Sequence, residues 1–320
     1  MKFTLKDLIP ENQDVLNHLL RSINTENVLQ DSNYEITIES FKRPKILYHY
    51  TSLSKLIAIL SQLKKTDDGQ FILRGTPIEY LNDWSEFSYG AQVLTDLIKE
   101  YENQNPNIVK ISDRIHANSW KDYICLGPIA TSPFITSFSK NKDSLPMWNI
   151  YGDNGQGVAI GVDSFKLNNL TNIKTNRPTL QRCRYSYNEF KDALFEFPDI
   201  HQTLYKIFEK EGITSFYLDP SSLRNAICSQ KHESFEFEKE WRLIKTCSQY
   251  DTNNEMNVNE HTCVPYIENK IPITALKEII IGPCKDLDLA KKTIEIALQN
   301  AGIERANVKI IKSEAPFRKI

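Results

Sequence analysis

Three glutamates alternate along one segment of the chain, where aromatic and basic residues surround them. Glu236, Glu238 and Glu240 are each separated by one residue. In a β-strand alternate side chains share a face, so these carboxylates would repel one another unless cations or a ligand compensated their charges. The basic residues nearest to them are Lys231, Lys239 and Arg242. Two interpretations stay open: a solvated edge that these cations neutralise, or a carboxylate held for chemistry.

Polar and aromatic side chains also gather near the middle of the chain. Ser137 and Ser139 alternate on an expected strand, and Trp148 and Tyr151 follow at helical spacing before a glycine-rich turn. Flat rings beside hydrogen-bond donors suit nucleotide-like ligands. The same pattern also fits a core helix that buries both rings, so this alternative stays open as well.

Two further polar groups stand where an expected strand or loop leads into a helix. His49, within Tyr48–Ser52, could donate from one ring nitrogen to a ligand hydroxyl or cap a strand internally. Asn82 and Asp83 precede the helix that is expected to begin near Glu86. Asp83 could belong to a polar site, or its carboxylate could accept amide hydrogens of the first helical turn.

The composition is that of an ordinary globular protein of 320 residues, with 40% hydrophobic and 25% charged residues. It indicates neither a disordered nor a fibrous chain. The formal net charge is −2 and no long basic block is present, so electrostatics give no clear sign of nucleic-acid binding. The six cysteines form no C-x-x-C pair, which favours reduced thiols, and we expect no metal site.

The hydrophobic pattern predicts a cytoplasmic protein without a membrane partner. Apolar runs are broken well short of a bilayer span, and Met1 is followed by charged residues rather than by a signal-peptide core. An amphipathic pattern between residues 4 and 22 predicts an N-terminal helical extension, residues 1–44. Residues 45–320 are expected to form a single domain.

Strands and helices are expected to mix without regular β–α–β alternation, which favours an α+β fold with a mixed or antiparallel sheet and flanking helices. Ser52 is expected to cap the helix that follows the first strand. The predicted strands are residues 45–50, 71–74, 124–139, 156–162, 180–187, 241–247, 262–267, 277–281 and 308–311. The other predicted helices are residues 86–120, with a break around Asn105-Pro106, and residues 189–209, 220–229 and 286–301.

Six motifs follow one another along the chain in a specific order. They are Leu47-Tyr48-His49-Tyr50-Thr51, Asn82-Asp83-x-x-Glu86, Ser137-Phe138-Ser139, Met147-Trp148-x-x-Tyr151-Gly152, Glu238-x-Glu240-Trp241-Arg242 and Ile280-Ile281-Gly282-Pro283. In this order they resemble the DUF2971 family of uncharacterised, mostly bacterial proteins, over about residues 45–318. The family name implies no activity.

Three of these motifs are also similar to those of ADP-ribosyltransferases, which carry one motif on each of three strands. His49 resembles the first motif of the members with histidine, Ser137–Ser139 the second, and Glu238-x-Glu240 the third. No tyrosine lies on the strand of the second motif, so the resemblance leaves the stacking of nicotinamide to Trp148 or Tyr151. It also implies an ADP-ribosyltransferase-like sheet core.

The ADP-ribosyltransferase resemblance implies an enzyme that takes NAD as its substrate and cleaves the nicotinamide–ribose bond, by transfer to an unknown acceptor or by hydrolysis. Glu240 or Glu238 would stabilise the oxocarbenium-like charge of that reaction. The implied cofactor-binding residues are His49, Tyr50, Thr51, Ser137, Ser139, Trp148 and Tyr151, and the other candidate polar residues are Asn82, Asp83, Glu86 and Arg242. A role in bacterial defence is expected.

Two other functions stay open. A metal-dependent nuclease would collect divalent ions on the carboxylates of Asp83, Glu86, Glu238 and Glu240. A non-enzymatic sensor would bind a nucleotide-like small molecule in the same cleft without changing it.

The NAD hypothesis leads to three expectations about the folded protein. His49, one of the two serines of the second motif and Glu240 should meet in one cleft, because motifs that share a ligand must meet in space. One ring face of Trp148 or Tyr151 should be open to that cleft. Glu240→Gln should lower turnover while leaving folding nearly unchanged.

Overall fold

The computed structural model of the protein describes residues 43–63, 69–81, 86–104, 131–168, 178–190, 227–248, 255–258, 263–283 and 285–316, together with residue 106. Almost all of the predicted N-terminal extension lies outside these residues, and so do most of the predicted helices at 189–209 and 220–229. Asn82 and Asp83 also lie outside them. Expectations about these parts stay predictions.

One sheet contains all ten strands found in the described residues. The strands are β1 (Ile46–Thr51), β2 (Gln70–Pro77), β3 (Thr131–Ser139), β4 (Val158–Asp163), β5 (Thr179–Arg182), β6 (Glu240–Ser248), β7 (Glu255–Val258), β8 (Cys263–Pro272), β9 (Leu276–Ile281) and β10 (Lys309–Lys312). Their order is β10-β9-β4-β1-β3-β2-β8-β7, and β6 pairs with both β3 and β5. Among the ladders of these strands only that between β9 and β10 is parallel. The predicted α+β class with a mixed, mostly antiparallel sheet is confirmed.

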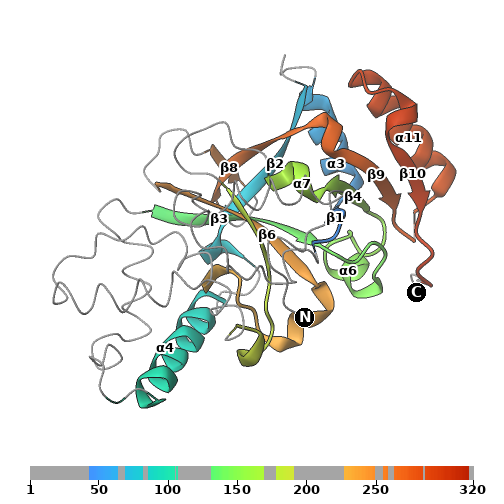
Figure 1. The fold of residues 1–320 in the computed structure, drawn as a ribbon. Helices are drawn as coiled ribbons and strands as arrows, with labels where there is room; N and C mark the ends of the chain where they lie inside the picture. Colours follow the sequence, from blue (N-terminus) through green and yellow to red (C-terminus); the bar gives the residue numbers. More distant parts are fainter. Residues whose placement is uncertain are drawn as a thin grey trace, which may run out of the picture. The chain divides into compact units, whose positions relative to one another are not determined.

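Strand β3 is the branch point of the sheet (Figure 1). Strand β6 pairs with it along its whole length, ending at the pair of Ser139 with Glu240. On the other edge of β3, β1 meets it at Ser139, whereas β2 meets it at Ile135. A strand has only two hydrogen-bonding edges, so β1 and β2 share one edge of β3 and diverge between these points. The three strands with the predicted ADP-ribosyltransferase-like motifs therefore adjoin at one end of β3.

The helices flank this sheet, and side chains cap the N-termini of α3 and α11. They are α3 (Leu53–Gln62), α4 (Glu86–Gln104), α6 (Leu145–Ile150), α7 (Ser164–Asn168) and α11 (Leu287–Asn300), with the 3-10 helices η5 (Ile78–Tyr80), η6 (Glu233–Glu238), η7 (Ile273–Ala275) and η8 (Arg305–Asn307). The Ser52 hydroxyl accepts the Lys55 amide hydrogen at the start of α3, which confirms the predicted cap. Asp286 caps α11 in the same way.

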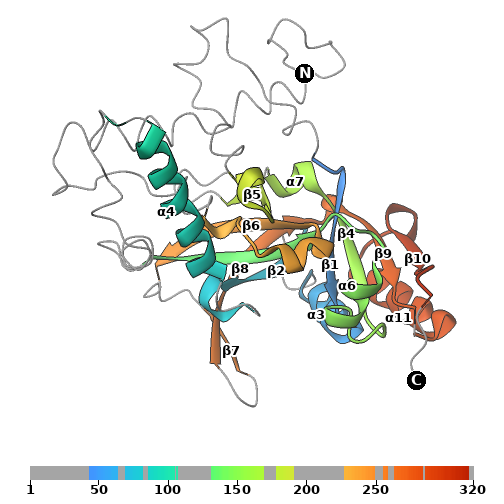
Figure 2. The ribbon, with the colours of Figure 1, turned by 90° about the horizontal axis from the view of Figure 1, so that it is seen from below.

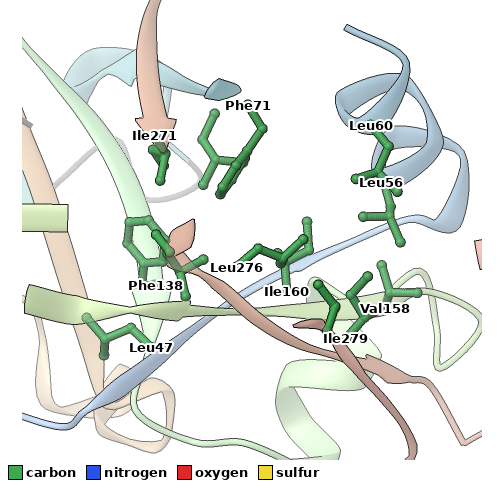
Figure 3. Close-up of a cluster of buried hydrophobic side chains, with 14 of the residues drawn as sticks. Leu47, Leu56, Leu60, Phe71, Phe138, Val158, Ile160, Ile271, Leu276 and Ile279 are labelled. Carbon is green, nitrogen blue, oxygen red and sulfur yellow. The ribbon is translucent and has the colours of Figure 1, made fainter. Parts of the chain in front are cut away.

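Helices α3 and α11 lie beside each other against one face of the sheet (Figure 1). Leu56 and Leu60 of α3 and Ile294 of α11 are buried in one hydrophobic cluster with Val158 and Ile160 of β4. These alternate residues of β4 point the same way, toward the helices, as Figure 3 shows for the labelled side chains. Burial of each such side chain contributes about 2 kcal/mol to folding.

The opposite face of the sheet carries a second apolar cluster, formed with α6 and η6. Figure 2 shows the ribbon of α6 next to β1 and β4. Tyr48 and Tyr50 of β1 pack there with Trp148 of α6, and Phe237 of η6 packs against them. Leu47, which directly precedes Tyr48 on β1, belongs to the α3 face because strand side chains alternate. The candidate site lies on the face of α6 and η6.

One predicted strand is longer than the observed element. The strand predicted at 180–187 ends at Arg182, because Cys183 N–H still bonds the Glu240 carbonyl oxygen whereas Arg184 N–H bonds that of Ser229. The chain thus leaves β6 for another segment, and a helical turn follows at 187–190. The predicted helix at 86–120 is observed as α4 up to Gln104, beside the break predicted around Asn105-Pro106, and its part from residue 107 lies outside the described residues. Among the described residues no helix is long and apolar enough to cross a membrane.

Candidate active site

The glutamate segment folds as a turn, so only two of its three carboxylates point inward. Helix η6 ends at Glu238, Lys239 has a left-handed backbone with φ 43°, and β6 begins at Glu240. Glu238 and Glu240 are 3% and 4% exposed, whereas Glu236 is exposed and pairs with Lys239 at 2.6 Å. The three carboxylates therefore do not share one strand face, because the left-handed residue Lys239 separates η6 from β6.

The end of β3 holds this turn in place. The Ser139 hydroxyl donates to the Glu238 backbone oxygen at 2.6 Å and accepts the Asn141 amide hydrogen at 2.9 Å. The Asn141 side chain donates to the Phe237 backbone oxygen at 2.8 Å. The Ser139 hydroxyl therefore forms both of these hydrogen bonds with backbone groups, and it fixes the position of Glu238.

We call the buried group formed by Lys231, Glu238, Glu240, Arg242 and Tyr151 the charge cluster. Its two carboxylates are opposed by two cations, so its formal charges balance. Each of the four charged residues is at most 4% exposed. Burying such groups is costly unless each is paired, and removing one partner from a buried pair costs about 3–5 kcal/mol.

Glu240 is the most heavily bonded carboxylate of the charge cluster. Arg242 donates to both of its oxygens, each at 3.0 Å, and Lys231 Nζ donates to Oε2 at 3.0 Å. The Cys183 thiol lies 3.6 Å from Oε2, and the Ser137 side chain also bonds this carboxylate. Burial by itself raises the pKa of Glu240, but the charges of Arg242 and Lys231 outweigh burial and lower that pKa to about 2.

Glu238 has fewer partners. Lys231 Nζ donates to its Oε2 at 2.6 Å, and the Tyr151 hydroxyl donates to its Oε1 at 2.8 Å. Burial raises the pKa of Glu238, Lys231 offsets part of that effect, and the neighbouring charge of Glu240 raises the pKa further. The two carboxylates therefore differ in both their hydrogen bonding and the direction of their pKa shifts.

Backbone groups orient the cations and the start of β6. Arg242 Nη1 donates to the Cys228 carbonyl oxygen at 2.7 Å, and Lys231 Nζ lies 4.7 Å from the centre of the Phe235 ring. The Glu240 backbone N–H donates to the Tyr185 hydroxyl at 2.6 Å. The charge cluster is thus built from the segment around Lys231, from η6 and β6, and from Tyr151 after α6. Residues after β5 contact it through Glu240.

The two aromatic residues that were expected to stack on a ligand lie in different surroundings. Trp148 is 0% exposed, and its indole Nε1 donates to Asp143 Oδ1 at 2.5 Å. Its ring also contacts Tyr50 edge-on at 4.8 Å between ring centres. Tyr151 is only partly buried, and its hydroxyl reaches Glu238. Trp148 therefore packs in the core, whereas Tyr151 contacts Glu238 and is itself partly exposed.

His49 is a neighbour of the charge cluster in the sheet but lies on its other face. Its Nδ1 donates to the Ser137 carbonyl oxygen at 2.9 Å, where β1 and β2 diverge, and its ring contacts Phe138. Phe138 belongs to the hydrophobic cluster of the α3 face, whereas Glu240 bonds the Ser137 side chain on the opposite face. Burial and the charge of Lys55 lower the pKa of His49, although the bond to Ser137 opposes this. His49 and Glu240 therefore do not meet in one cleft.

Tyr50, Thr51 and Glu86 are the remaining predicted site residues within the described part of the chain. The Tyr50 hydroxyl donates to the Asn141 carbonyl oxygen at 3.0 Å, and Thr51 ends β1 beside Val158. Glu86 begins α4, and its side chain lies outside the description. Among the described residues no group of three or more His, Cys, Asp or Glu is placed to hold a metal ion.

Sequence reasoning gave Lys231 only a supporting role and did not identify Cys183 or Tyr185. Lys231 precedes Glu238 by seven residues, so a close pair of opposite charges in one segment was the available signal. Cys183 and Tyr185 are more than fifty positions before Glu240, and the pairing of β5 with β6 brings them to it. No local sequence signal reveals that pairing.

Residues 147–243 match a family model described as "Protein of unknown function (DUF2971)". This match confirms the predicted DUF2971 family for this part of the chain. It contains the charge cluster, whereas the predicted motifs before residue 147 and after residue 243 lie outside it. Searches of curated proteins and of solved structures gave no significant match, and no comparison confirms the ADP-ribosyltransferase resemblance.

Proposed function

We propose that the protein binds NAD and cleaves its nicotinamide–ribose bond, with Glu238 as the carboxylate that opposes the positive charge of the reacting ribose. The observation that carries this proposal is the placement of Glu238: a buried carboxylate held by Lys231 on one oxygen and by the partly exposed Tyr151 on the other. A carboxylate fixed in this way is oriented before the substrate arrives, which is the requirement for electrostatic stabilisation of a transition state.

Hydrogen-bonding capacity favours Glu238 over Glu240 for this role. An ionised carboxylate accepts about four hydrogen bonds. Glu240 already receives donors from Arg242, Lys231, Cys183 and Ser137, with Arg242 occupying both oxygens. Glu238 receives two side-chain donors and retains the capacity to accept a ribose hydroxyl.

The chemistry follows from charge. As the bond to nicotinamide breaks, its electrons leave with nicotinamide and the ribose becomes oxocarbenium-like. Glu238 would accept a hydrogen bond from a ribose hydroxyl, and its negative charge would stabilise the cation more strongly than the ground state. Water or an acceptor nucleophile would then bond to the ribose carbon and release its proton to solvent, which gives hydrolysis or transfer of ADP-ribose.

The proposal also covers the scaffold and the cellular setting of the protein. An ADP-ribosyltransferase-like scaffold is supported by the adjacency of β1, β3 and β6, which carry the three resembling motifs. The proposal does not use His49, whose ring lies with Phe138 on the other face, or Trp148, which is fully buried. It places the protein in the bacterial cytoplasm, where consumption of NAD would serve defence.

A second candidate function is a non-enzymatic sensor of a nucleotide-like ligand. The balanced charges of the cluster favour it, because two carboxylates and two cations satisfy one another without a ligand. Such a cluster can hold a binding surface in shape without reacting.

Two measurements on the full-length protein separate these functions. Nicotinamide release from NAD is followed with and without candidate acceptor proteins, and thermal melting is recorded with NAD, with magnesium or manganese, and with neither. We expect nicotinamide release and a melting temperature that rises with NAD concentration. A rise without release would favour the sensor, a rise with metal alone would favour the nuclease alternative, and no response to NAD in either measurement would contradict the proposal.

A further inference from the structure

The two carboxylates of the charge cluster depend on Lys231 to different degrees. Lys231 Nζ lies 2.6 Å from Glu238 and 3.0 Å from Glu240. Glu240 also has the guanidinium of Arg242 on both oxygens, so it keeps a cationic partner without Lys231. Within the described residues, the ion pairs of Glu238 include no cation besides Lys231.

We propose that Lys231 is a positioning residue that keeps Glu238 ionised and aimed into the charge cluster, whereas Glu240 and Arg242 form a self-sufficient anchor beside it. The catalytic importance of Lys231 rests on the proposed function, since only an ionised Glu238 can oppose an oxocarbenium-like charge. The different dependence of Glu238 and Glu240 on Lys231 is a property of the folded protein and is testable without NAD.

The groups facing Glu238 come from several elements. Lys231, from the segment before η6, is the cation, and Glu240 of β6 is a like charge. The hydroxyl of Tyr151, after α6, donates to Glu238, and Tyr185, after β5, is close enough for Glu238 to raise its pKa. Without Lys231, burial and the like charge would therefore act on Glu238 with only a hydroxyl to oppose them.

This arrangement predicts how stability should depend on pH when Lys231 is removed. In Lys231→Met the pKa of Glu238 would be higher in the folded than in the unfolded protein. Stability contributed by a group of this kind is fully present below its unfolded pKa and is lost as the pH rises through the folded pKa. The variant should therefore be weakened more at mildly alkaline than at acidic pH.

The test compares thermal unfolding of four full-length proteins: wild type, Lys231→Met, Lys231→Met with Glu238→Gln, and Lys239→Met. Lys239 is the matched control because it is exposed and pairs with the exposed Glu236. Relative to wild type, Lys231→Met should lose about 5 °C more in melting temperature at about pH 8 than at about pH 5. The double variant should not show this extra loss, and Lys239→Met should follow wild type.

A deficit in Lys231→Met that is equal at both pH values, or that persists unchanged in the double variant, would overturn the proposal, because lost packing alone would explain it. If Lys231→Met does not fold at the higher pH, folding of the double variant supports the proposal and failure of the double variant contradicts it.

Nicotinamide release adds the catalytic readout. The rate of Lys231→Met should recover as the pH rises, since Glu238 would ionise only there, and Lys231→Arg should restore most of the rate at neutral pH. If wild type releases no nicotinamide, the proposed function fails while the unfolding test still decides the role of Lys231. A Lys231→Met pH profile parallel to that of wild type would contradict the role in catalysis.

Discussion

Glu240 and Glu238 are two positions apart, yet their surroundings suit them to different roles. Glu240 is enclosed by a guanidinium, an ammonium, a thiol and a hydroxyl, which suits an anchor. Glu238 is held from two sides and retains capacity to accept another hydrogen bond. The two roles are separated by Lys239, whose left-handed backbone turns the chain between Glu238 and Glu240.

Glu240→Gln should destabilise the protein by about 3 kcal/mol, because it leaves two buried cations with one anion and places an amide donor against Arg242. This replaces the sequence-based expectation that folding would be nearly unchanged. Urea unfolding of the variant beside Glu236→Gln, whose side chain is exposed, is the measurement. A free energy of unfolding equal to that of the control would show that Glu240 is not an anchor.

Close approach of backbone segments decides which residues the ends of β1 and β9 tolerate. The turn between α6 and β4 contains Asp153, Asn154 and Gly155 with positive φ, and it packs against the ends of β1 and β9. A Cβ atom at Gly157 would clash with the backbone oxygen of Thr51, and one at Gly282 with that of Gly155. Glycine is required at both positions because backbone, rather than a flexible side chain, is the obstacle.

Gly157→Ala should therefore lower the free energy of unfolding by more than about 2 kcal/mol, since β1 or the turn must shift to admit a methyl group. Gly69→Ala is the matched comparison: Gly69 has φ 58° but nothing within 4 Å of an added Cβ, so only backbone strain of about 1 kcal/mol applies. Chemical denaturation of both variants is the measurement. Equal losses would contradict the role given to close packing at the turn.

Across the whole molecule, Asp143 joins parts that are far apart in sequence. It accepts hydrogen bonds from Trp148 of α6, from the Ser313 hydroxyl at 2.6 Å and from the Glu314 amide at 2.6 Å. The segment after β10 is thereby tied to the loop after β3. Burial alone raises the pKa of Asp143, but the hydrogen bonds from Ser313, Trp148 and Glu314 outweigh it and lower that pKa.

Because the pKa of Asp143 is lower in the folded protein, its contribution is present above the unfolded pKa and is lost as the pH falls through the folded pKa. Asp143→Asn should cost about 1–2 kcal/mol at neutral pH, and the difference from wild type should shrink below about pH 4. Denaturation across acidic pH values measures it. A difference that stays constant down to the acid transition would show that the charge of Asp143 is not involved.

Periodicity predicted the fold class and the positions of most strands, because alternation along β4 and the cap at Ser52 are local properties of the chain. The branch at β3 could not be predicted, since pairing between distant strands leaves no local trace. Proximity of the serines and glutamates was expected because motifs that share a ligand must meet in space. His49 lies on the other face because the sequence did not reveal which face of β1 would point to that site.

The central claim, that Glu238 opposes the charge of a reacting ribose, is tested most directly by nicotinamide release from NAD by wild type, Glu238→Gln and Glu236→Gln. Glu236 lies on the same 3-10 helix and is exposed, so its variant controls for the loss of one negative charge. We expect Glu238→Gln to lower kcat by about a hundredfold or more with little change in NAD affinity, and Glu236→Gln to match wild type. Equal rates for wild type and Glu238→Gln would contradict the claim.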